Sequence, residues 1–207
     1  MGAYESDPSF HALHVVRIRG RASIESVRAA VGREDVLDLL RPLAGDGHVE
    51  YRTGRAPGWA ITPTGRDHHA ELLAAEREAA VTHDDVLGQY ERFLSINQGL
   101  IDICSAYQVR PDGTLNDHTD AGYDADVVDR LADVHVDATP VCEALTGSMT
   151  RFTAYEPRLG AALDRVRAGE SAWFTGLLVD SYHTVWFELH EDLLQTLGRD
   201  RQAEGSG

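Results

Sequence analysis

The feature that most constrains the fold of this chain is the turn-rich segment at residues 43–66, LAGDGHVEYRTGRAPGWAITPTGR. A Gly-Asp-Gly turn precedes Val49 and Tyr51, which alternate with polar residues as in a half-buried strand. The Thr-Gly-Arg-Ala-Pro-Gly stretch that follows is typical of a tight turn. Trp59 and Ile61 then alternate with Ala and Thr, which indicates a second strand. We therefore expect a β-hairpin at this point of the chain.

Three short helices are predicted before the hairpin. Residues 10–19 carry apolar side chains at close to helical spacing. Ser23 is a suitable N-cap for a second helix, which ends at the next glycine, and residues 34–44 predict a third helix. Thr62 or Thr64 is expected to cap a helix after the hairpin. The predicted order is helix, helix, helix, hairpin, helix, with the apolar face of the hairpin packed on the three helices.

The segment from residue 43 to residue 66 resembles the recognition-helix-to-wing region of MarR-like winged helix-turn-helix transcriptional regulators. In those families an apolar helix end leads through Asp-Gly to a strand and a basic, glycine-containing wing. A second strand then ends in a Leu/Ile-Thr-Pro-x-Gly-Arg signature, which here is Ile-Thr-Pro-Thr-Gly-Arg at residues 61–66. The resemblance implies a winged helix-turn-helix domain at residues 1–66 and double-stranded DNA as a partner.

The remainder of the chain has helical periodicity. Helices are expected at residues 66–81, 84–107, 124–145, 150–168 and 180–197, with a loop at residues 108–122. The C-terminal half, including DSYHTVWFELHEDLLQTLG at residues 180–198, is similar to the second half of uncharacterised actinobacterial proteins labelled as regulators. The fold class is therefore expected to be mainly α with a small β-hairpin. An acidic helical effector and dimerisation domain would span residues 67–200, and residues 201–207 would form a disordered tail.

The charge of the chain is unevenly distributed. The net charge is -15, and all nineteen basic residues are Arg. Residues 1–70 hold nine Arg and nine acidic residues, whereas residues 71–207 hold ten Arg and twenty-five acidic residues. The second half should repel phosphate, so any contact with nucleic acid is expected to come from the first half.

Six arginines are candidates for DNA contact. Arg52 and Arg55 flank Gly54 at the hairpin tip, where they can reach phosphates or a narrow minor groove. The others are Arg17, Arg19 and Arg21 at the end of the first helix, and Arg41 on the third helix.

Carboxylates near these arginines favour a different interpretation. The arginines can instead pair with neighbouring acidic residues such as Glu50 on a solvated surface. The third helix also has Glu34, Asp35 and Asp38 on its outward face. Three carboxylates that face phosphates are unfavourable, and a good major-groove reader offers other side chains there. The N-terminal module would then bind DNA weakly or serve only as a structural module.

The second half offers a candidate ligand-binding set of Tyr90, Trp173, Tyr182, His183, Trp186 and His190. With acidic residues nearby, these side chains can line a pocket for a flat or cationic small molecule. The alternative is an aromatic-rich core, because an apolar stripe through Trp186 recurs at helical spacing in residues 182–197. We expect this stripe to pack against the helix at residues 84–107, either within a subunit or across a dimer. His183 and His190 would lie about 10 Å apart along a helix, too far to share a metal ion.

Catalytic motifs are missing from the sequence. There is no GxSxG, P-loop, HExxH or GxGxxG, so we expect neither an enzyme nor a bound cofactor. Cys104 and Cys142 are interpreted as buried thiols, and no CxxC pair indicates a zinc site. Glu188 and Asp192 are four residues apart, a spacing that is common on exposed helix surfaces.

The leading hypothesis from the sequence is a cytoplasmic transcriptional regulator. The chain has no secretory signal and no run of about 18 apolar residues, so no membrane contact is expected. The regulator would act as a homodimer and respond to a small molecule through its helical domain. The alternative is a small-molecule-binding or sequestering protein in which the winged helix no longer reads DNA.

Overall fold

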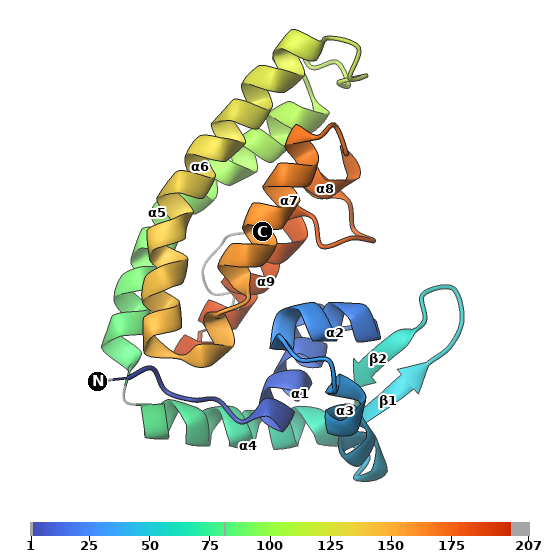
Figure 1. Ribbon diagram of the computed structural model, residues 1–207, viewed down its shortest axis with the longest axis vertical. Helices are drawn as coiled ribbons and strands as arrows, with labels where there is room; N and C mark the ends of the chain where they lie inside the picture. Colours follow the sequence, from blue (N-terminus) through green and yellow to red (C-terminus); the bar gives the residue numbers. More distant parts are fainter. Residues whose placement is uncertain (1, 81, 200–207) are drawn as a thin grey trace.

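The computed structural model describes residues 2–80 and 82–199 and is mainly helical, with one small antiparallel hairpin in that part of the chain (Figure 1). The mainly α fold class with a β-hairpin is thereby confirmed. The predicted tail at residues 201–207 lies outside the described residues. The elements are α1 (Pro8–Arg19), α2 (Ile24–Val31), α3 (Val36–Gly45), β1 (Val49–Arg52), β2 (Gly58–Ile61), α4 (Pro63–Ala80), α5 (His83–Gln108), α6 (Ala121–Ser148), η1 (Thr150–Phe152), α7 (Tyr155–Arg167), α8 (Ala172–Thr175) and α9 (Tyr182–Leu197).

Short-range capping explains where several helices begin. The Asp7 side chain accepts a hydrogen bond from the backbone N–H of Phe10 at the start of α1. Ser23 caps α2 as predicted, and Ser181 caps α9 by accepting from the backbone N–H of Thr184. Each cap satisfies one N–H group that has no partner within its helix.

The hairpin pairs Val49 with Ile61 and Tyr51 with Trp59. It is extended by one further backbone bridge, in which Ala22 and Trp59 exchange hydrogen bonds of 2.8 and 2.9 Å. Ala22 lies between α1 and α2, so this bridge fixes the first two helices against β2. A Cβ atom on Gly58 would lie 2.8 Å from the carbonyl oxygen of Ala22, which explains why glycine begins this strand.

The Ile-Thr-Pro-Thr-Gly-Arg signature joins the hairpin to α4. The Thr62 hydroxyl accepts from the backbone N–H of Gly65 at 2.9 Å, and it lies 2.6 Å from the carbonyl oxygen of Gly47. The Thr64 hydroxyl donates to the same carbonyl at 3.0 Å. A Cβ atom on Gly65 would lie 1.9 Å from the carbonyl oxygen of His48, so only glycine fits there. The start of α4 is thus fastened to the turn before β1.

Buried apolar side chains form two clusters. One cluster is built from α1, α2, α3 and the hairpin, and the other from α5, α6, α7 and α9. Figure 1 shows α5 and α6 side by side as a long pair, with α7 and α9 beside them and the hairpin extending away from the other elements. None of the described helices is both long enough and apolar enough to cross a membrane.

The last helix packs as expected. The Trp186 ring stacks on Phe93 of α5 with a centroid distance of 4.6 Å, so the predicted packing of the two helices is confirmed within one chain. The expectation for Glu188 and Asp192 was wrong, because both carboxylates are buried. The predicted helix at residues 150–168 begins with the short η1 turn, which directs Arg151 into the interior.

Candidate functional site

The acidic residues expected on the third helix lie at its start, with Glu34 and Asp35 before the first residue of α3 and Asp38 in its first turn. Glu34, Asp35 and Asp38 are exposed, as is Arg41. Each carboxylate has an arginine partner. Arg33 contacts Asp35 at 2.6 Å, and Arg41 contacts Asp38 at 3.3 Å. The third pair joins Arg28 and Glu34, also at 3.3 Å. Each of these negative charges therefore has a positive charge beside it.

The hairpin tip presents the two arginines predicted for the wing. Arg52 and Arg55 are both exposed, and Gly54 between them adopts a φ of 116°. Arg52 contacts Glu50 at 2.6 Å across a surface where both side chains are half exposed. Exposed pairs of this kind contribute only about 0–1 kcal/mol. The Arg52 guanidinium can therefore exchange its partner for a phosphate at small cost.

The three arginines near the end of α1 lie in different surroundings. Arg17 and Arg21 are partly buried, and the Arg21 guanidinium donates to the carbonyl oxygen of Ala56 at 2.9 Å. Arg19 points into the molecule and pairs with Asp180 at 2.8 Å and with Glu188 at 3.2 Å. These two carboxylates hold Arg19 in the interior, so it is not available to a phosphate in this arrangement.

Arg151 is the centre of a buried ionic cluster. Its side chain is fully buried and reaches carboxylates on two helices, Glu76 of α4 at 2.9 Å and Asp192 of α9. It also donates to the Thr196 hydroxyl at 2.5 Å. Burial alone would raise the pKa of Asp192, but Arg151 and then His14 lower it well below its ordinary value. Asp192 is therefore ionised throughout the neutral range.

Two histidines and a tyrosine complete this cluster. His14 of α1 lies 3.1 Å from Asp192, and its other ring nitrogen lies 2.8 Å from a ring nitrogen of His69 on α4. Burial lowers the pKa of His69 to about 3, so this ring is neutral at pH 7. The Tyr155 hydroxyl donates to Asp192 at 2.9 Å, and burial and then the Asp192 charge raise its pKa well above the usual value. The cluster thus joins α1 and α4 to α7 and α9.

A second ionic cluster lies beside the first. Asp180 and Glu188 each contact both Arg19 and Arg158, so four side chains form a closed ring of alternating charge. The shortest contact is 2.6 Å, between Arg158 and Glu188. Burial raises the pKa of Glu188 despite the two arginines, whereas the arginines outweigh burial and lower the pKa of Asp180. We call the two clusters together the ionic junction.

Sequence reasoning did not identify the ionic junction. Arg151, Arg158 and Glu76 were not singled out, Asp180 was considered only as a possible cap of the last helix, and Asp192 was placed on the surface. One signal was present in α9, where residues 188 and 192 fall on the same side as the apolar stripe through residues 185, 189 and 193. Carboxylates on the buried face of a helix require a cationic partner in the interior.

The predicted ligand-binding residues divide into three groups. His183, Trp186 and His190 of α9 line a groove of about 390 Å³ between α5 and α9. Tyr90 and Tyr182 are fully buried in the core beneath it. Trp173 lies on α8, where the Arg165 guanidinium covers its ring at 4.6 Å. The remaining described lining residues are Asn97, Leu100, Ile101, Cys104, Ser105, Gln108 and Phe187.

The wall of the groove is held in place by a hydrogen bond between the helices. The Trp186 indole N–H donates to the Asn97 side-chain oxygen at 2.9 Å, while its ring stacks on Phe93. Burial lowers the pKa of His183, so its imidazole is neutral at pH 7. Its Nδ1 atom is buried and has no hydrogen-bond partner among the described residues.

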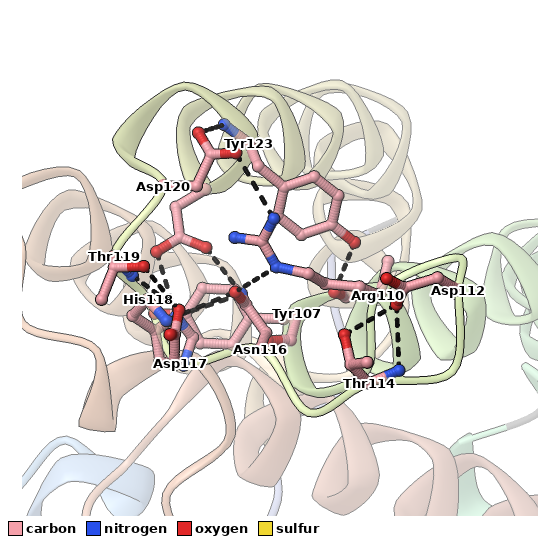
Figure 2. Close-up of polar contacts among 12 residues, drawn as sticks. Tyr107, Arg110, Asp112, Thr114, Asn116, Asp117, His118, Thr119, Asp120 and Tyr123 are labelled. Atoms are coloured by element: carbon pink, nitrogen blue, oxygen red, sulfur yellow. Dashed lines mark hydrogen bonds and ion pairs between the residues drawn. The ribbon is translucent and has the colours of Figure 1, made fainter.

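The loop between α5 and α6 satisfies its own polar groups (Figure 2). The Asn116 amide is buried and donates to the carbonyl oxygen of Tyr107 at 3.1 Å and to Asp124 at 2.7 Å. Asp112 accepts from Thr114, and Asp117 accepts from Thr119 in the same way. These hydrogen bonds indicate that the polar residues of this loop have a structural role. In residues 2–80 and 82–199, no three His, Cys, Asp or Glu side chains are grouped to hold a metal ion.

Comparisons of the chain with protein-family models, with curated proteins and with solved structures gave no match. The function must therefore be argued from the arrangement of the chain's own residues.

Proposed function

We propose that this chain is a DNA-binding transcriptional regulator, with a MarR-like winged helix-turn-helix head at residues 1–66 and an acidic helical domain at residues 67–200. The observation that carries the proposal is the bridge between Ala22 and Trp59. It joins the α1–α2 connection to the hairpin through a one-residue bridge, so the order becomes helix, bridge, helix, helix, strand, strand. A protruding two-stranded wing beside an exposed third helix is the arrangement by which winged-helix proteins approach a duplex.

The proposed DNA contacts lie on the hairpin and on the adjoining helices. Arg52 and Arg55 are the principal contacts, because the hairpin tip is exposed and extends from the other elements (Figure 1). Arg41 is exposed on α3, and Arg17 and Arg21 are partly exposed near the end of α1. We leave Arg19 out of this set because the ionic junction engages it.

The carboxylates on α3 limit the kind of recognition. Each is paired with an arginine, so the face has little net charge but offers few donors to base edges. We therefore propose that the wing reads the shape and charge of the minor groove more than α3 reads bases. The excess of acidic residues in the helical domain keeps that domain away from phosphates and orients the head toward them.

The ionic junction gives the helical domain a rigid connection to the head. Arg19 and His14 of α1 bind carboxylates of the α8–α9 region, and the space between α1, α7 and α9 is only about 10 Å³. A shift of α9 must therefore move α1 or break buried ion pairs. In a homodimer on two half-sites, such a movement would change the spacing of the two heads.

A fluorescence-anisotropy titration with labelled duplexes at several salt concentrations tests the proposal. The wild type should bind, and its affinity should fall steeply with salt. Arg52→Ala with Arg55→Ala should weaken binding and lower the salt slope by about 2, since each lost phosphate contact releases about 0.9 counterions fewer. The matched control removes the same charge from exposed positions of the helical domain, Arg92→Ala with Arg130→Ala. Equal effects of the two double variants would show that the wing does not contact DNA.

A second function is favoured by the carboxylates of α3. In that case the chain is a small-molecule-binding or sequestering protein whose winged helix no longer reads DNA. Failure of the wild type to bind any duplex even at low salt, where electrostatic attraction is strongest, would select this function over the first.

A further inference from the structure

The groove between α5 and α9 has the dimensions and the lining of a small-molecule site. Its volume of about 390 Å³ lies in the range of pockets that hold a drug-sized ligand. Trp186 and Leu100 form apolar wall, and both are buried. Ile101 and Phe187 at the groove are each 46% exposed. A ligand that covers these two side chains would remove apolar surface from water.

The described polar groups that line the groove include no carboxylate, ammonium or guanidinium. They are the amides of Asn97 and Gln108, the Ser105 hydroxyl and the imidazoles of His183 and His190. Among the described lining residues there is no Asp, Glu, Lys or Arg. A charged ligand would therefore lose hydration without gaining a counter-charge. The sequence left both a flat and a cationic ligand open, and among the described residues the groove offers no carboxylate to a cation.

The polar groups that a ligand can reach lie on α5. The Nδ1 atom of His183 is buried and has no surface open to the groove. The Ser105 hydroxyl and the Gln108 amide line the groove at exposed positions, so a ligand can exchange a hydrogen bond with them. The indole of Trp186 is fixed by Asn97 and Phe93 and is buried, so it forms a rigid wall. The exposed ring of Phe187 is the aromatic surface open to a ligand.

We propose that this groove binds a neutral, planar aromatic molecule of two or three rings, which stacks on Phe187 and exchanges one hydrogen bond with Gln108 or Ser105. A regulatory effect of this ligand rests on the proposed function of the chain, whereas ligand binding itself does not depend on that function. The ligand would lie against α9, the helix that also carries Glu188 and Asp192 of the ionic junction. Binding would thereby act on the same helix that holds the head.

Two fluorescent probes that differ in charge test the site without DNA. N-phenyl-1-naphthylamine is neutral, and 8-anilinonaphthalene-1-sulfonate has nearly the same shape with an added sulfonate. The wild type should bind the neutral probe saturably at one molecule per chain, and the sulfonate at least about tenfold more weakly because its charge has no partner. Equal affinity for the two probes, or no saturable binding of the neutral one, would overturn the proposal.

Matched variants on α5 locate the probe. Ile101→Glu places a carboxylate in the groove, whereas Leu94→Glu makes the same change two turns away at a partly exposed position that does not line it. Ile101→Glu should lower the affinity for the neutral probe at least about tenfold, and Leu94→Glu should leave that affinity within about twofold of the wild-type value. Ser105→Phe, at an exposed position, should also weaken the probe by filling the groove. Thermal melting verifies that each variant is folded.

The outcomes separate this site from its competitors. If the face is covered by a second copy of the chain, the wild type will sediment as a dimer and exclude the probe, and both glutamate variants will release monomers; that result overturns the proposal. If the wild type binds the probe but no DNA, the proposed ligand site is supported and the proposed regulatory function is overturned. If the wild type binds DNA but not the probe, the regulatory function is supported and the ligand site is overturned.

Discussion

Replacement of Arg151 by methionine should destabilise the chain more than any surface substitution. The guanidinium is fully buried and holds Glu76 at 2.9 Å, Thr196 at 2.5 Å and the Asp192 carboxylate. Methionine fills much of the space but leaves two buried carboxylates without their cation. Removal of one partner from a buried ion pair typically costs about 3–5 kcal/mol. For a chain of this length that corresponds to a fall in Tm of about 6–20 °C.

The assay is urea unfolding of the wild type and of Arg151→Met at pH 7.5 and pH 5. Without the arginine, burial should raise the pKa of Asp192 above its wild-type value. The destabilising effect of that carboxylate is then largest above the raised pKa and shrinks as the pH falls through it. The difference in unfolding free energy between wild type and variant should therefore be smaller at pH 5. Arg130→Met, on the exposed side of α6, should stay within about 0.5 kcal/mol of the wild type.

A triple variant distinguishes lost ion pairing from lost packing. Arg151→Met combined with Glu76→Leu and Asp192→Leu removes the stranded carboxylates and should recover at least about half of the lost stability, since buried ion pairs can be replaced by apolar groups of similar volume. A loss below about 1 kcal/mol in the single variant, or no recovery in the triple variant, would refute the assignment of Arg151 as the necessary counter-charge.

Two further predictions concern pH and the turn before the wing. The pKa of His69 is about 3 in the folded chain against 6.5 as its ordinary value, so its neutral form contributes stability that is complete above pH 6.5 and is lost as the pH falls toward 3. Between pH 7 and pH 5 the wild type should lose about 2 kcal/mol more than His69→Gln in urea unfolding, and identical pH dependence would contradict this. Gly65→Ala should lower the Tm clearly, because its Cβ would lie 1.9 Å from the His48 carbonyl oxygen, whereas Gly99→Ala, in open space on α5, should leave the Tm unchanged or raise it. Equal Tm values for the two alanine variants would show that the turn at His48 can shift to accommodate a Cβ atom at position 65.

The amino-acid sequence by itself determined the hairpin and the elements around it. Alternation at residues 49–51 and 59–61, turn residues between them and a hydroxyl at position 62 act within a few residues of one another. Ser23 likewise caps the helix that it precedes. Such signals are local, so they can be read before any tertiary contact is known. The apolar stripe of α9 also identified its buried side, including Trp186.

Only the tertiary structure decided which charged residues lie inside. Arg19 was expected at DNA, but its partner Asp180 lies 161 residues away in the chain. Arg151 contacts Glu76 and Asp192, which are 75 and 41 residues away from it in the sequence. The sequence also grouped six ligand candidates, of which the fold brings three to one groove. A charge is buried only where the fold supplies its partner, and because these partners come from distant helices, no local pattern could reveal them.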